Sequence, residues 1–220
     1  MKKTLSIIMS VILIFSVFSL NVFAADTKTE TLLEEINENK EVAVTLVAGD
    51  IPLFGANSDA RDIIYLKDDK AAYEYKAGFI NVRVVIDDGD IVAFIPAFPY
   101  VHVKLDTLAI GDIDTWELVN KLTNLTVGVL NYVDSYEETF EGKTYYVEEF
   151  NDRAQVTSKF YYEGDALKVL VVTDAKTHSV QNTYFDDISL DVDDSIFKLP
   201  LISFDMTPVL AALFLSLLAA

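Results

Sequence analysis

The side chains that could do chemistry in this sequence are few and widely spaced. The two histidines, His102 and His178, lie far apart in the chain, and each lies in or beside a predicted strand. A zinc site needs several nitrogen or sulfur ligands. The chain has no cysteine, which also excludes disulfides and cysteine nucleophiles. We therefore predict no metal site and no cofactor.

Carboxylates are abundant, but their spacing does not suit catalysis. Glu148 and Glu149 are adjacent in a predicted strand, so their side chains point to opposite faces. Asp191, Asp193 and Asp194 lack the central glycine and the terminal glutamate of a calcium-binding loop, and we expect a solvated acidic turn there. The sequence also contains no G-x-S-x-G, H-E-x-x-H or phosphate-loop motif. We predict that the protein is not an enzyme.

The first 24 residues have the pattern of a bacterial secretory signal peptide. Lys2 and Lys3 precede an apolar run from Leu5 to about Leu20, and Val22 and Ala24 place small residues before a cleavage site near Ala24. An N-terminal membrane anchor is the alternative. We expect a secreted or extracytoplasmic protein, in the periplasm or at the cell surface.

Charge and composition narrow the choice of partners. Acidic residues outnumber Lys plus Arg by 35 to 17, and the net charge of −18 repels nucleic acid.

No linker divides residues 25–200, which we expect to form a single domain. Residues 201–220 form an apolar tail. Its uncharged part, 208–220, is shorter than the roughly 20 residues that a membrane-spanning helix needs.

Helix signals occur at two places in the mature chain. Thr27 and Glu30 have capping-box spacing, and Leu32, Leu33 and Ile36 follow on one face, which predicts a long N-terminal helix over about 28–39. A short central helix is predicted over 116–122.

The rest of the chain predicts strands joined by short turns. They cover 42–47, 63–67, 71–75, 82–86, 91–94, 100–105, 125–132, 135–140, 144–150, 156–162, 167–173 and 180–190. Asp88-Gly89 is a strong hairpin signal between two of them. Turns at this spacing favour consecutive antiparallel hairpins.

Several predicted strands are apolar on both faces. Residues 63–66 (IIYL) and 169–172 (VLVV) are uninterrupted apolar runs. Since two helices cover only part of such a sheet, we predict a mainly β (α+β) fold. It is a curved antiparallel sheet forming an incomplete barrel, with the helices over its concave side. A helix, the apolar tail or a ligand would fill that side. The alternative is a β-sandwich that covers its own inner faces.

Three segments resemble one family. Residues 142–150 (GKTYYVEEF), 159–162 (KFYY) and 191–200 (DVDDSIFKLP) are similar to parts of the lipoprotein-localisation factors and outer-membrane lipoprotein-sorting proteins, the LolA-like superfamily. The resemblance covers roughly residues 28–200. It implies an incomplete barrel with an apolar cavity for acyl chains, and a lipoprotein or another envelope protein as partner.

We therefore expect a non-enzymatic protein of the cell envelope that binds a lipid or another apolar ligand. The alternative is a cell-surface interaction or sensor module whose cavity is filled by its own tail. The candidate cavity residues are apolar or aromatic strand residues: Tyr65, Val84, Ile86, Phe94, Tyr145, Val147, Phe160, Tyr162, Val169 and Val171.

Overall fold

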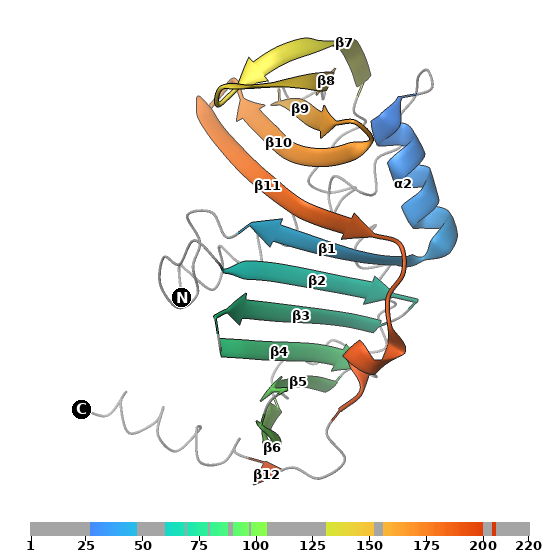
Figure 1. The fold of residues 1–220 in the computed structure, drawn as a ribbon, viewed down its shortest axis with the longest axis vertical. Helices are drawn as coiled ribbons and strands as arrows, with labels where there is room; N and C mark the ends of the chain where they lie inside the picture. Colours follow the sequence, from blue (N-terminus) through green and yellow to red (C-terminus); the bar gives the residue numbers. More distant parts are fainter. Residues whose placement is uncertain are drawn as a thin grey trace, which may run out of the picture.

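The computed structural model describes residues 27–47, 60–68, 70–78, 80–87, 90–96, 98–104, 131–151, 156–199 and 204–205. These residues form a large sheet, one α-helix and one short 3-10 helix (Figure 1). The predicted signal peptide 1–24, the central helix 116–122 and the apolar segment 208–220 lie outside the described residues.

Helix α2 (Lys28–Asn39) confirms the predicted N-terminal helix. The Thr27 hydroxyl accepts a hydrogen bond from the Glu30 amide at 3.1 Å, which is the first half of the capping box. At the other end, Lys40 adopts a left-handed conformation (φ 51°), and its amide donates to the Ile36 carbonyl at 3.0 Å. The helix buries Thr29, Leu33 and Ile36.

The described strands belong to one sheet. They are β1 (Glu41–Val47), β2 (Arg61–Lys67), β3 (Lys70–Ala77), β4 (Ile80–Asp87), β5 (Asp90–Ile95), β6 (Phe98–Lys104), β7 (Asn131–Phe140), β8 (Lys143–Asn151), β9 (Val156–Glu163), β10 (Ala166–Asp174), β11 (Ser179–Ser189) and β12 (Phe204–Asp205). Their order is β12-β6-β5-β4-β3-β2-β1-β11-β10-β9-β8-β7. All neighbours are antiparallel except β12 and β6, which are parallel.

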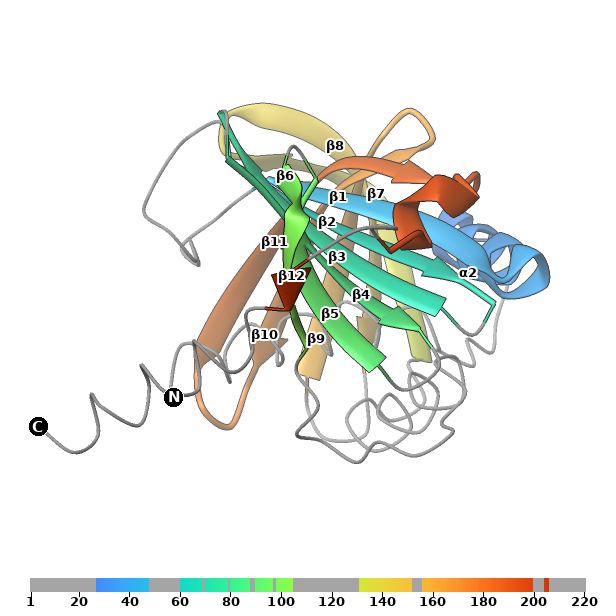
Figure 2. The same cartoon turned by 90° about the horizontal axis from the view of Figure 1, so that it is seen from below.

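This sheet is an incomplete barrel, as the sequence predicts. The strands at the two ends of the order, β12 and β7, do not pair with each other, so the sheet is not closed (Figure 2). The β-sandwich alternative is wrong because the described strands do not divide into two stacked sheets. The Asp88-Gly89 hairpin is confirmed, since β4 and β5 pair as far as Asp87 and Asp90.

Two local predictions need correction. Strand β7 is continuous where the sequence indicates a break between Tyr132 and Ser135. A β-bulge between Tyr132 and Asp134 absorbs the irregularity, so the pairing with β8 continues past it. The acidic turn after residue 190 contains the 3-10 helix η1 (Asp194–Phe197), whose Ser195 amide donates to the Asp193 side chain at 2.7 Å.

The two faces of the sheet are packed differently. Helix α2 covers the concave face, where one buried cluster joins α2 to both halves of the sheet through Leu33, Ile36, Val42, Val44, Ile64, Leu66, Phe150, Phe160, Tyr162, Leu167, Leu170 and Phe185. The convex face carries separate clusters, one of them under η1. The consecutive residues Ile63 to Leu66 are all buried, which confirms that the middle strands avoid water on both faces.

Candidate functional site

The concave face of β3, β4 and β5 carries a continuous set of apolar side chains. Alternation along each strand and the pairs Tyr73↔Val84 and Val84↔Ala93 place them on one surface. We call this surface the concave apolar patch; it consists of Tyr73, Val82, Val84, Ile86, Ala93 and Ile95. Ile86 is 37% exposed and Ile95 is 42% exposed, and the other four are half-buried.

The sequence of β4 explains why this patch forms. Val82, Val84 and Ile86 alternate with Arg83 and Val85, and Val85 is fully buried on the convex face. The concave phase therefore carries three β-branched residues and the convex phase carries Val85, and such residues favour extended backbone. The convex set packs under η1, while the concave set forms the patch.

The packing around α2 stops before it reaches this patch. The cluster under the helix extends to Ala71 and Tyr73 on β3, but among the described residues it includes none from β4 or β5. Ile86 and Ile95 therefore remain accessible beside the half-buried apolar side chains of β3 to β5. Accessible apolar side chains grouped on a curved sheet are typical of a surface that binds an apolar partner.

A polar pair lies at the β2 side of the patch. The Tyr73 hydroxyl donates a hydrogen bond to the carboxylate of Asp62. Asp62 lies on the concave face, since it pairs with Leu46 on β1 and Tyr75 on β3. Burial raises the pKa of Asp62 above its ordinary value, and the hydrogen bond from Tyr73 opposes this only in part.

A buried carboxylate anchors α2 over the concave face. Glu148 on β8 is fully buried and accepts the backbone amides of Lys28 at 2.8 Å and Thr29 at 2.9 Å. The Thr29 hydroxyl also donates to it at 2.6 Å, and the Tyr162 hydroxyl lies 2.9 Å from that of Thr29. The first amides of a helix lack partners within the helix and favour a negative charge. Glu148 is therefore a structural cap supplied from about 120 residues away.

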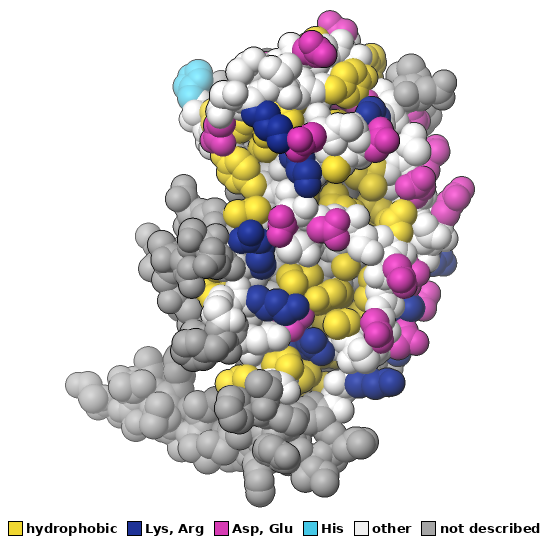
Figure 3. Space-filling view, viewed as in Figure 1, with side chains coloured by type: hydrophobic (Ala, Val, Ile, Leu, Met, Phe, Trp, Pro, Cys, Tyr) yellow, Lys and Arg dark blue, Asp and Glu magenta, His cyan; other side chains and the backbone are white. Residues whose placement is uncertain are grey.

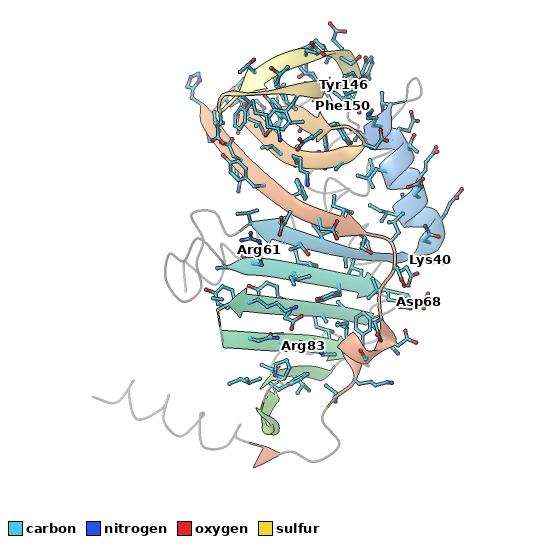
Figure 4. All side chains as sticks on the ribbon, in the orientation of Figure 1. Lys40, Arg61, Asp68, Arg83, Tyr146 and Phe150 are labelled. Atoms are coloured by element: carbon cyan, nitrogen blue, oxygen red, sulfur yellow. The ribbon has the colours of Figure 1, made fainter. Side chains whose placement is uncertain are left out.

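The Lys28 side chain extends this anchor to the neighbouring aromatic residues. Its ammonium lies 5.4 Å from the centre of the Tyr146 ring and 5.9 Å from that of Tyr162, and it pairs with Asp165 at 2.8 Å. Tyr146 and Phe150 lie on the same strand near the start of α2 (Figure 4). Phe150 is buried, whereas Tyr146 is 37% exposed.

The convex face carries a buried polar cluster. Glu74 is 1% exposed, accepts the Tyr65 hydroxyl at 2.9 Å and lies 3.2 Å from Nη2 of Arg83. Burial alone would raise the pKa of Glu74, but hydrogen bonds from Asn81 and Tyr65 and the charge of Arg83 outweigh it and lower that pKa. Arg83 also donates to the Ile196 carbonyl of η1 at 3.3 Å.

Figure 3 shows this convex face, where basic, acidic and hydrophobic side chains are interspersed. Several of the basic side chains are already paired. Arg61 donates to Asp186 at 2.9 Å, and Lys159 pairs with Glu138 at 2.8 Å. These two basic side chains of the convex face are therefore neutralised by acidic partners.

The ten residues predicted to line a cavity do not share one surface. Val84, Ile86, Phe160 and Tyr162 lie on the concave face, and Phe160 and Tyr162 are buried in the cluster under α2. The other six lie on the convex face: Tyr65 and Phe94 are buried under η1, and Tyr145, Val147, Val169 and Val171 form a separate cluster. Only Val84 and Ile86 belong to the concave apolar patch.

Sequence reasoning missed the remaining members of the site. Val82, Ala93 and Ile95 share the alternation phase of Val84 across β4 and β5. Asp62 lies one strand beyond Tyr73. The available signal was the hairpin at Asp88-Gly89, because it fixes which residues of β4 and β5 face each other. Choosing one phase of alternation across that hairpin would have selected these residues together.

The residues of the described ranges include no metal-ligand group and no membrane-spanning helix. None of these residues forms a group of three or more His, Cys, Asp or Glu side chains that could hold a metal ion. No helix in the described part of the chain is long and apolar enough to cross a membrane.

The sequence matches no protein-family model and no curated protein. Solved structures with a similar chain trace include an uncharacterized conserved protein from Thermus thermophilus, with 9% identity and a TM-score of 0.37, covering 81% of this chain and 99% of that one. They also include a LolA superfamily protein from Nitrosomonas europaea, with 17% identity and a TM-score of 0.26, covering 79% and 98%. Both TM-scores are low, so the fold assignment rests on the strand order and registers described above.

Proposed function

We propose that this protein binds an apolar ligand, such as a lipid acyl chain, on the concave apolar patch. The observation that carries the proposal is the position of Ile86 and Ile95. Both are more than one-third exposed on the concave face, beside half-buried valines and outside the cluster that α2 covers. The proposed role is that of a carrier or binding protein of the cell envelope, with no catalytic step.

The free energy available to such a ligand is sufficient. Burying one methylene group contributes about 0.8 kcal/mol, so a long acyl chain gains on the order of 10 kcal/mol before its ordering is subtracted. A rigid sheet loses little conformational freedom when it binds, because its backbone hydrogen bonds are already formed. The patch therefore needs no rearrangement to favour an acyl chain over water.

The proposal is tested by titrating the delipidated protein with dodecanol and counting bound molecules by native mass spectrometry. We expect binding by the unaltered chain and a loss of affinity of roughly tenfold in Ile86→Gln and in Ile95→Gln. The matched control is Val180→Gln, because Val180 is 63% exposed and lies on β11 away from the patch. No uptake by the unaltered protein, or equal losses in all three variants, would contradict the proposal.

The competing occupant of the concave side is the chain's own segment 208–220. Deleting this segment separates the two ideas. If the segment fills the site, the deletion will raise dodecanol uptake and lower thermal stability together. If an external ligand fills the site, the full chain and the variant that lacks residues 208–220 will take up the same amount of dodecanol.

We also propose that residues 1–24 direct export and are removed. The support is the two lysines, the apolar run and the small residues at positions 22 and 24. N-terminal sequencing of the protein purified from a secreting bacterial host should begin at Ala25. A mature protein that still begins at Met1 and stays with the membrane would contradict this.

A further inference from the structure

Asp62 is distinctive for its position on the sheet. On the concave face of β1 to β5 the described side chains are otherwise uncharged: Val42, Val44, Leu46, Ile64, Leu66, Ala71, Tyr73, Tyr75, Ala77, Val82, Val84, Ile86, Ala93 and Ile95. Asp62 therefore supplies the negative charge of this described surface, and no Lys or Arg side chain of the surface lies beside it. An apolar surface with one acidic end selects among amphiphiles by their head groups.

The Asp62 carboxylate is only partly satisfied. Its Oδ1 accepts the hydrogen bond from Tyr73, and among the described residues it has no ion-pair partner. The neighbouring Arg61 points to the convex face, where its Nε donates to Asp186 at 2.9 Å. A half-buried anion with spare acceptor capacity gains most from a cationic or hydrogen-bond-donating group. Its raised pKa agrees with this lack of a cation.

Tyr73 connects Asp62 to the concave apolar patch. The tyrosine ring belongs to the patch through its pairing with Val84, and its hydroxyl reaches Asp62. From β2, which carries Asp62, to β5, which carries Ile95, there are three strand spacings of about 4.8 Å, or roughly 14 Å in all. An extended dodecyl chain matches this span. Because Asp62 pairs with Tyr75 and Tyr75 with Val82, its head would then lie beside Asp62 while its tail passes over Val82 towards Ile95.

We propose that the ligand is a single-chain amphiphile with an amine head, which pairs with Asp62 while its alkyl chain lies on the concave apolar patch. This inference rests on the proposed function and adds the class of head group. A fatty-acid carboxylate would be placed against a like charge, in a protein whose net charge is already −18. An uncharged alcohol would bind through its chain alone.

The test compares dodecylamine, dodecanol and dodecanoate by calorimetry below their micelle concentrations. We expect dodecylamine to bind about tenfold more tightly than dodecanol and dodecanoate to bind most weakly. In Asp62→Asn the amine and the alcohol should become equal, while the affinity for the alcohol stays as it was. The control is Asp187→Asn, which removes one exposed charge on the convex side and should preserve the preference.

The outcomes separate this inference from the proposed function. If dodecanol binds but all three head groups bind alike, or if Asp187→Asn removes the preference as fully as Asp62→Asn, the amine proposal is wrong and the apolar site stands. If none of the three amphiphiles binds, both proposals are wrong. Should Asp62→Asn not fold, the ranking of head groups on the unaltered protein still decides the matter.

Discussion

Glu148 and Glu74 show how two buried carboxylates of the same type take different roles. Both are at most 1% exposed. Glu148 faces the concave side and accepts backbone amides from the start of α2, so its partners are a helix end and the hydroxyl of Thr29. Glu74 faces the convex side and has Arg83 and Tyr65 as partners. The first stabilises a contact between elements, and the second stabilises the sheet beneath η1.

At the residue scale, we predict that Glu148→Ala lowers the free energy of unfolding by about 3 kcal/mol. The change leaves the buried amide of Thr29 and the part-buried amide of Lys28 without their acceptor, and an unsatisfied buried donor is costly. Urea unfolding followed by circular dichroism measures the effect. Glu149→Ala is the control, since Glu149 is half-buried on the opposite face and accepts a hydrogen bond from the Tyr136 hydroxyl at 2.6 Å. Equal losses in both variants would contradict the capping role.

A pH prediction follows from the lowered pKa of Glu74. An unfolded glutamate takes up a proton near pH 4.3, whereas folded Glu74 does so only at lower pH. Its stabilising contribution is therefore complete above that pH and is lost as the pH falls through the folded-state pKa. We predict that Glu74→Gln lowers the free energy of unfolding by about 3 kcal/mol at neutral pH and by less in acid. Urea unfolding as a function of pH checks this.

The control for this pH series is Glu137→Gln, because Glu137 is an exposed residue on β7. It should leave the pH dependence as in the unaltered chain. A stability difference between Glu74→Gln and the unaltered chain that stays constant from neutral to acid pH would show that the lowered pKa of Glu74 is not the cause.

At the scale of elements, the C-terminal end of α2 is followed by a residue in an unfavourable backbone conformation. Lys40 has a φ of 51°, a region where a side chain is strained and glycine is not. Its carbonyl accepts the Asp68 amide at 2.9 Å, so the turn joins α2 to the β2–β3 hairpin (Figure 4). The backbone of Lys40 is thus held by two hydrogen bonds, one to Ile36 and one to Asp68.

We predict that Lys40→Gly raises the free energy of unfolding by about 1 kcal/mol, because it removes the strain while keeping the backbone bonds. Thermal unfolding measures the gain. Lys40→Ala is the matched control: it removes the same charge but keeps a β-carbon, so it should bring no gain. A gain of equal size in both variants would assign the effect to charge instead of backbone conformation.

The same element shows what sequence could predict and what it could not. Thr27, Leu33 and Ile36 predicted α2 correctly because capping and 3.6-residue periodicity are local properties. The partner of its first amides, Glu148, could not be predicted, since it comes from a strand far along the chain. Similarly, η1 depends on burying Phe197 against β2 to β5, a contact that no local pattern specifies.

At the scale of the whole molecule, the two-sided apolar strands explain both the success and the failure of prediction. Runs such as Ile63 to Leu66 correctly predicted a sheet buried on both faces. Apolar and polar residues do not alternate in these runs, so the sequence does not show which side chains face α2 and which face η1. This is why Tyr65 and Phe94, named as cavity residues, lie under η1 instead. Strand registers, and not composition, separate the two faces.

The central claim is that an apolar ligand lies on the concave face of β4 and β5. It is tested most directly by cross-linking the unaltered protein to an uncharged long-chain diazirine probe and locating the modified residues by peptide mass spectrometry. We predict adducts at Val84, Ile86, Ala93 or Ile95, with competition by unlabelled dodecanol. Adducts confined to the convex side, at Val180 or Tyr184, or adducts that dodecanol does not displace, would contradict the account.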